Sequence, residues 1–192
     1  PRMSLVLLDP AGQTVAAVPE GAPLIVGRAI ECHVTLTDPT ISRRHAAVVH
    51  LRDAPPTDDR NEIATALADR LKSDPDRAVR TEAAAALATW GTPETVPALI
   101  GALTDGDSFV RQKAMETLAK SKDPRAAGPL AACLKADRHH AADCLKRFGP
   151  GAEVAVLPYL DDSDGWVRLE AARVLQEIGT ARSLPALRQA GE

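Results

Sequence analysis

Aromatic residues, cysteines and long apolar runs are all scarce in this sequence. Phenylalanine, tryptophan and tyrosine make up 3% of the 192 residues, and the three cysteines are Cys32, Cys133 and Cys144. Because an odd, scattered set does not fit the disulfide framework of a small secreted domain, we expect reduced thiols. No apolar stretch approaches the roughly 20 residues that cross a bilayer, and the first residues carry too short an apolar run for a secretory signal. These absences predict a cytoplasmic protein with no membrane partner.

Charge of one sign is not concentrated in any segment. The formal net charge is -3, and no long basic or acidic run is present. The positive surface expected of a protein that binds nucleic acid or an anionic membrane is therefore missing. Familiar enzyme motifs are missing as well, since there is no glycine-rich phosphate loop, no His-Glu-x-x-His and no Gly-x-Ser-x-Gly. We therefore expect a protein that catalyses no reaction, binds no nucleic acid and needs no cofactor.

Residue types that can ligate a metal gather in one segment rich in alanine and leucine. His140 and Cys144 are four residues apart and would share a helical face. The spacing matches no zinc signature, and a cysteine among alanine and leucine usually behaves as a small buried residue. We expect no metal at this cluster, which consists of Cys133, His139, His140 and Cys144.

The chain divides into two parts of different composition. Residues 1–51 contain short runs rich in β-branched residues, separated by Asp, Pro and Gly, which is typical of strands and turns. Residues 52–60 are polar and carry Pro55-Pro56, which disfavours a helix, so we interpret them as a linker. Residues 61–192 are rich in alanine and leucine and are predicted to be helical.

The helical part contains a pattern that returns about every 30 residues. Its core is Arg-x-x-Ala-x-x-x-Leu, in which alanine and leucine lie on one helical face. Because one helix cannot bury this face alone, the units must stack. We expect four helical hairpins, an unpaired capping helix from Glu62 to Lys72, and left-handed caps at Gly91, Gly149 and Gly179. The pattern occurs at Arg80, Ala83, Leu87; Arg111, Ala114, Leu118; Arg138, Ala141, Leu145; and Arg168, Ala171, Leu175.

These units resemble the HEAT-type repeats first recognised in phycobilisome bilin lyases. In that family, aspartates of the inter-repeat loops and the repeat arginines generally form a structural ladder between successive repeats. The third unit departs from the pattern, with Leu134 at the aspartate position and Asp137 in place of a valine, which predicts a local break or shift in the stack. Trp90, Tyr159 and Trp166 are expected to pack between repeats. The resemblance assigns the ladder to Asp76, Arg80, Asp107, Arg111, Arg138, Asp164 and Arg168.

The first part carries a second family resemblance. Ile25-Val26-Gly27-Arg28, a strand, and then Ser42-Arg43-Arg44-His45-Ala46 are similar to the signature of forkhead-associated domains, which bind phosphothreonine peptides. By position, the resemblance implies that Arg28 pairs with the phosphate, Ser42 donates its hydroxyl and Arg43 contacts the peptide or phosphate. Gly27 and His45 would support the site. A guanidinium suits this role because it presents paired, planar donors to phosphate oxygens.

The forkhead-associated resemblance covers only the beginning of that domain, because the later strands and their asparagine-bearing loop are missing. We therefore predict an α+β multidomain protein, in which a partial β-sandwich precedes an α-solenoid of about four HEAT-type hairpins. Its expected function is that of a non-catalytic protein–protein interaction scaffold or adaptor that recognises phosphothreonine peptides. The alternatives are a bilin-lyase-like or chaperone-type subunit, and a solenoid binder with a vestigial forkhead-associated segment.

Overall fold

The N-terminal part contains two pairs of short strands in the computed structural model. β1 (Val6–Leu8) pairs antiparallel with β2 (Thr14–Ala17), and β3 (Val26–Gly27) pairs parallel with β4 (Val34–Thr35). The sandwich predicted for this part falls largely outside the described residues and stays a prediction. The structure describes residues 6–8, 14–17, 26–27, 34–35 and 60–189.

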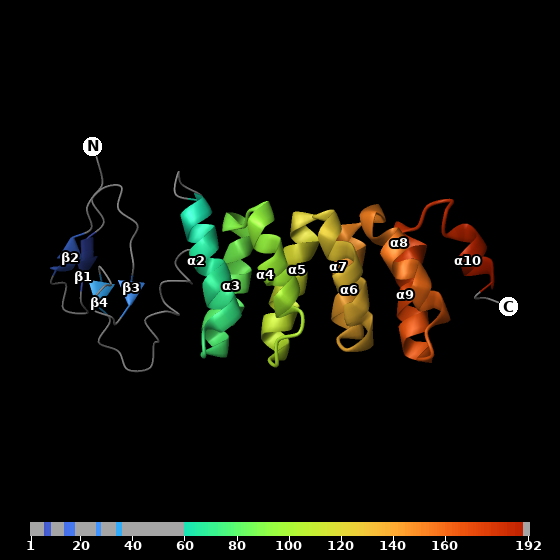
Figure 1. Cartoon of the computed structure of the whole chain (residues 1–192), viewed down its shortest axis with the longest axis horizontal. Coiled ribbons are helices and arrows are strands. Elements are labelled where there is room, and N and C mark those ends of the chain that lie inside the picture. The colour runs from blue at the N-terminus through green and yellow to red at the C-terminus, as the bar shows by residue number, and fades with distance from the viewer. Residues whose placement is uncertain (1–5, 9–13, 18–25, 28–33, 36–59, 190–192) are drawn as a thin grey trace.

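The helices stack side by side along one axis, as the repeats predict (Figure 1). α3 contacts α5, α5 contacts α7, and α7 contacts α9, so we call these four helices the long-helix row. α2, α4, α6 and α8 each pack against one member of that row and form the opposite row. The predicted α-solenoid is confirmed, but its hairpins pair α2 with α3, α4 with α5, α6 with α7 and α8 with α9, one helix earlier than the sequence pattern predicts. The helices are α2 (Arg60–Ser73), α3 (Arg77–Trp90), α4 (Val96–Ala102), α5 (Ser108–Ser121), α6 (Ala127–Ala132), α7 (Arg138–Phe148), α8 (Glu153–Val156), α9 (Gly165–Ile178) and α10 (Leu184–Gln189).

The first helix differs from the expected unpaired cap. α2 begins at Arg60, inside the segment interpreted as a linker, and packs along α3 as the first half of the first hairpin. The Arg60 side chain donates hydrogen bonds to the carbonyl oxygens of Trp90 (3.2 Å) and Gly91 (2.7 Å). These bonds satisfy carbonyls that the end of α3 leaves without helical partners. The start of α2 is thus fixed by the next helix.

The alanine and leucine of each repeat form the core between the two rows. The four repeat alanines are fully buried, and the four repeat leucines are at most 3% exposed. A small residue lets neighbouring helices approach closely, while leucine fills the space beside it. Thr117 adds a polar link, because its hydroxyl donates to the Ala84 carbonyl of α3 over 2.7 Å. The core therefore continues from repeat to repeat without interruption.

The glycines at the helix ends serve two different purposes. Gly149 has a φ of 85°, in the left-handed region that glycine favours. Lys122, which follows α5, also adopts a left-handed conformation, with a φ of 53°. The left-handed cap predicted at Gly91 and Gly179 is wrong, since both have negative φ. Glycine is needed there because a Cβ would collide with the carbonyl oxygen of the preceding leucine, Leu87 or Leu175.

Within the described residues, none of the helices is both long enough and apolar enough to cross a membrane.

Candidate functional site

The predicted phosphopeptide site lies almost wholly outside the described residues. Gly27 is the exception, and it pairs with Thr35 between strands β3 and β4. Arg28, Ser42, Arg43 and His45 are not among the described residues. Their roles remain predictions.

The repeat arginines link successive repeats through paired hydrogen bonds. Arg80 donates to both carboxylate oxygens of Asp105, from Nε over 2.8 Å and from Nη2 over 3.0 Å. Arg111 makes the same two-pronged contact with Asp137, over 2.7 and 3.0 Å. A third nitrogen of each arginine donates to the carbonyl of its own loop, at Asp74 and Asp105 respectively. Each arginine therefore fixes one loop and binds the next.

The aspartates assigned to the ladder have a different main role. Asp76, Asp107 and Asp164 are the N-cap residues of α3, α5 and α9, and each accepts a hydrogen bond from the N–H two residues later. Such caps satisfy donors that a helix start leaves free. Asp107 also pairs with Arg77 over 2.9 Å. The ladder acceptor for Arg80 lies two residues before the N-cap of α5, at Asp105, which the sequence pattern did not single out.

The third repeat shifts the ladder, as its sequence predicts. α7 begins at Arg138, whereas α3, α5 and α9 begin three residues before their repeat arginine. Consequently Nη2 of Arg138 lies 3.8 Å from Oδ2 of Asp164, farther than the ladder contacts of Arg80 and Arg111. Lys135 takes over the link to the fourth repeat and binds Asp162 at 3.0 Å. In that repeat, Arg168 donates to the Asp162 carbonyl over 2.7 Å and so fixes its own loop.

The cysteine and histidine cluster is engaged in packing. Burial raises the pKa of Cys133 to about 11 and that of Cys144 to about 12, so both thiols stay protonated at neutral pH. His139 contacts Glu170 of α9 at 3.1 Å, and His140 contacts the Gln112 carbonyl of α5 at 3.2 Å. The two histidines thus connect α7 to both neighbours. No group of three metal-ligating side chains occurs among the residues that the structure describes.

Two aromatic side chains of the long-helix row are exposed to solvent. Phe109 is 62% exposed and Trp166 is 61% exposed. Both occupy the second position of their helix, in α5 and α9, so they repeat at the same edge of the row. The expectation that Trp166 packs between repeats is wrong, whereas Trp90 is buried as expected, with 1% exposed. Leu169, one turn after Trp166, is also 38% exposed.

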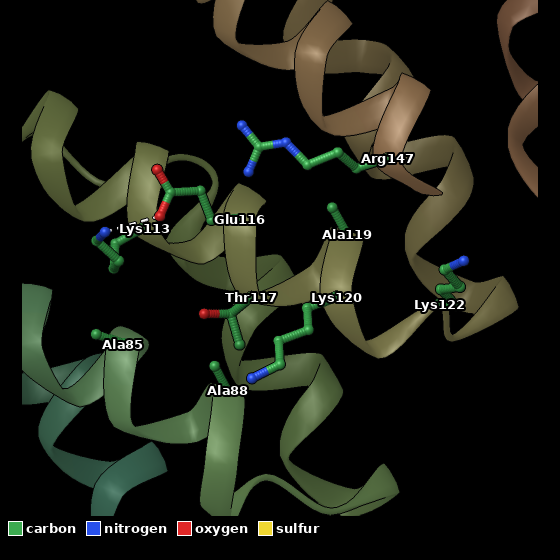
Figure 2. Close-up of a pocket in the computed structure, with 9 residues that line it drawn as sticks. All are labelled: Ala85, Ala88, Lys113, Glu116, Thr117, Ala119, Lys120, Lys122 and Arg147. Carbon is green, nitrogen blue, oxygen red and sulfur yellow. Dashed lines mark hydrogen bonds and ion pairs between the residues drawn. The ribbon is translucent and has the colours of Figure 1, made fainter. Parts of the chain in front are cut away.

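A hollow of about 470 Å³ lies on the same row, lined by α3 and α5, with Arg147 of α7 at its edge (Figure 2). Ala85 and Ala88 of α3 line it together with Thr117 and Ala119 of α5. Charged side chains form its rim, and Figure 2 shows Arg147 extending from α7 toward α5. The rim consists of Lys113, Glu116, Lys120, Lys122 and Arg147.

The cations at this rim differ in their partners. Lys113 is paired with Glu116 over 2.7 Å. Lys120, Lys122 and Arg147 form no ion pair with any carboxylate in the described part of the chain. The hollow therefore combines methyl groups at its base with three cations that form no ion pair among the described residues.

Comparisons with known proteins agree with this architecture. A family model for HEAT repeats matches residues 64–140 and 135–192, and a family model for the FHA domain matches residues 24–62. No curated protein matches the chain.

Several solved structures are similar to it. The complex of CpcE and CpcF of phycocyanin lyase from a Nostoc species is 25% identical with a TM-score of 0.53, covering 74% of this chain and 62% of that one. Human deoxyhypusine hydroxylase is 22% identical with a TM-score of 0.51, covering 74% of this chain and 59% of that one. An engineered protein is 24% identical with a TM-score of 0.52, covering 82% and 81%. This chain thus spans about three fifths of the two natural proteins.

Proposed function

Because the chain belongs to the HEAT-repeat family and carries part of an FHA domain before the repeats, we propose that it is a non-catalytic adaptor. Its solenoid binds a protein partner through the long-helix row. Its N-terminal segment recognises a phosphothreonine peptide. HEAT repeats present an extended surface on a stacked core, which suits the binding of another protein.

The observation that carries the scaffold function is the pair of exposed aromatics on one row. An exposed Phe109 and Trp166 add nothing to the core, and aromatic residues are enriched in protein interfaces, where they contribute most of the binding energy. Their equivalent positions, two repeats apart, give a partner two anchor points along one edge of the solenoid. The long-helix row is therefore the binding face in this proposal.

Site-specific photo-crosslinking tests the choice of face. A photoreactive phenylalanine analogue at position 109 or 166 is expected to cross-link a protein partner in cells of the source organism. The matched control is the same analogue at Val154, which is 57% exposed but belongs to α8 of the opposite row. Equal cross-linking from position 154, or none from 109 and 166, would contradict the proposed face.

Recognition of phosphothreonine is supported by the matching FHA segment. The matched range, 24–62, contains Gly27, Arg28, Ser42, Arg43 and His45. In the proposal, Arg28 binds the phosphate, Ser42 donates its hydroxyl and Arg43 contacts the peptide. A phosphate offers three acceptor oxygens and nearly two negative charges, so these donors distinguish it from an unmodified threonine.

A second candidate function follows from the likeness to phycocyanin lyase. In this alternative the solenoid is a bilin-lyase-like or chaperone-type subunit that holds a tetrapyrrole or its acceptor protein. A visible-absorption scan after mixing the protein with a bilin separates the two. A shifted and intensified bilin band favours the alternative, and an unchanged spectrum favours the adaptor.

A further inference from the structure

We propose that the hollow lined by α3 and α5, with Arg147 of α7 at its edge, binds an acidic segment of the protein partner. This inference rests on the proposed adaptor function and names the chemistry of its partner. The hollow and the exposed Phe109 both belong to α5, where Phe109 and Lys120 are eleven residues apart, close to three full turns. A partner lying along α5 would contact Phe109 near the start of the helix and Lys120 near its end.

Charge is the first argument for an acidic occupant. The chain as a whole carries a net charge of -3, yet Lys120, Lys122 and Arg147 gather around one hollow without a carboxylate partner among the described residues. The other cations of the row are used differently, since Arg80 and Arg111 are held in the ladder. Like charges that face each other without compensation repel, and an incoming carboxylate relieves that repulsion.

Stabilisation of helix ends does not by itself account for these cations. Lys120 and Arg147 lie in the last turns of α5 and α7, where a positive charge complements the helix dipole. However, α3 and α9 belong to the same row, and their last turns contain no basic residue. Cations therefore occur at the last turns of α5 and α7, which supply the charged rim of the hollow, and not at those of α3 and α9.

The shape and lining of the hollow favour a peptide over a nucleic acid. Its base is formed by the methyl groups of Ala85, Ala88 and Ala119, which suits small apolar side chains between acidic ones. No aromatic side chain lines it, so bases would find no stacking partner.

Fluorescence anisotropy with the intact chain tests the inference. The probe is a short fluorescein-labelled peptide of alternating glutamate and alanine. The variant Lys120→Glu/Arg147→Glu is expected to bind this probe at least about tenfold more weakly than the unaltered chain, because two attractions become repulsions. The matched control is Lys72→Glu/Arg188→Glu, which changes the same charges at exposed residues of α2 and α10 and should alter binding by less than about twofold.

Three results would overturn the inference. One is equal binding of the probe to both double variants when their thermal unfolding matches that of the unaltered chain. Another is preferred binding of a single-stranded oligonucleotide of equal charge. The third is self-association of the unaltered chain that the Lys120→Glu/Arg147→Glu variant abolishes, since the occupant would then be a second copy.

Photo-crosslinking separates this inference from the adaptor function. If the double variant still cross-links its partner from position 109 while the probe does not bind the unaltered chain, the acidic-segment inference fails and the adaptor function stands. If positions 109 and 166 of the unaltered chain capture no protein, the adaptor function itself fails.

Discussion

Replacing Trp90 by alanine is expected to lower the free energy of unfolding by about 3–5 kcal/mol. Trp90 ends α3, is 1% exposed and belongs to the continuous core. Truncation removes the largest side chain of the core and leaves a cavity that the surrounding helices fill only in part. The Arg60 hydrogen bond to residue 90 is kept in the variant because its acceptor is the backbone carbonyl, so the expected loss comes from the missing side chain. Urea denaturation followed by circular dichroism measures the loss.

The chain contains a matched control for this prediction. Trp166→Ala makes the same chemical change at a side chain that is 61% exposed. It should change the free energy of unfolding by no more than about 0.5 kcal/mol, because surface substitutions leave no cavity. Similar losses in the two variants would contradict the described packing.

Removing the ladder acceptor Asp105 is expected to cost about 2 kcal/mol of stability. The carboxylate accepts two hydrogen bonds from Arg80 and a third from the Asp107 N–H. The side chains of Arg80 and Asp105 are 18% and 13% exposed, so Asp105→Ala leaves a mostly buried guanidinium without its partner. The control is Asp143→Ala on α7, an exposed aspartate, which should be nearly neutral. If Asp105→Ala lowered the free energy of unfolding no more than Asp143→Ala does, the ladder would make no measurable contribution to stability.

The same carboxylate makes the contribution of the ladder depend on pH. Burial raises the pKa of Asp105, but the hydrogen bonds from Arg80 and the Asp107 N–H outweigh this effect, so its pKa lies below the ordinary value. A carboxyl with a lowered folded-state pKa stabilises the fold above its unfolded-state pKa, about 3.9, and loses that contribution as pH falls through the folded-state pKa. The stability difference between the unaltered chain and Asp105→Ala should therefore shrink below about pH 4.

The repeat architecture could be predicted from the sequence because its signals are local and recur. Alanine and leucine four residues apart define the buried face of each helix, and all eight residues of this pattern lie in the core. The departure of the third repeat was also visible, since Asp137 replaces a valine. Asp137 accepts hydrogen bonds from Arg111 and so keeps the ladder intact, although α7 begins at its repeat arginine and not three residues before it.

Other features could not be predicted because they depend on contacts between distant residues. The sequence pattern assigned Asp107 to the ladder, and only the structure shows that Asp105 binds Arg80 whereas Asp107 caps α5. The hollow requires Arg147 of α7 to lie across from Lys120 of α5. A tryptophan in a helical repeat is usually buried, so the exposure of Trp166 had no local signal. The carboxylates two residues before the N-caps of α3, α5 and α9, at Asp74, Asp105 and Asp162, were the available clue.

The measurement that tests the adaptor function most directly is the binding of a phosphothreonine peptide library to the intact protein. Unphosphorylated peptides and the variant Arg28→Ala/Ser42→Ala serve as controls. The proposed function predicts binding that depends on the phosphate and is lost in the variant, because both donors to the phosphate are removed. Binding no stronger than that of the unphosphorylated peptides, or binding unchanged in the variant, would contradict phosphothreonine recognition. The solenoid would then be the sole proposed binding surface.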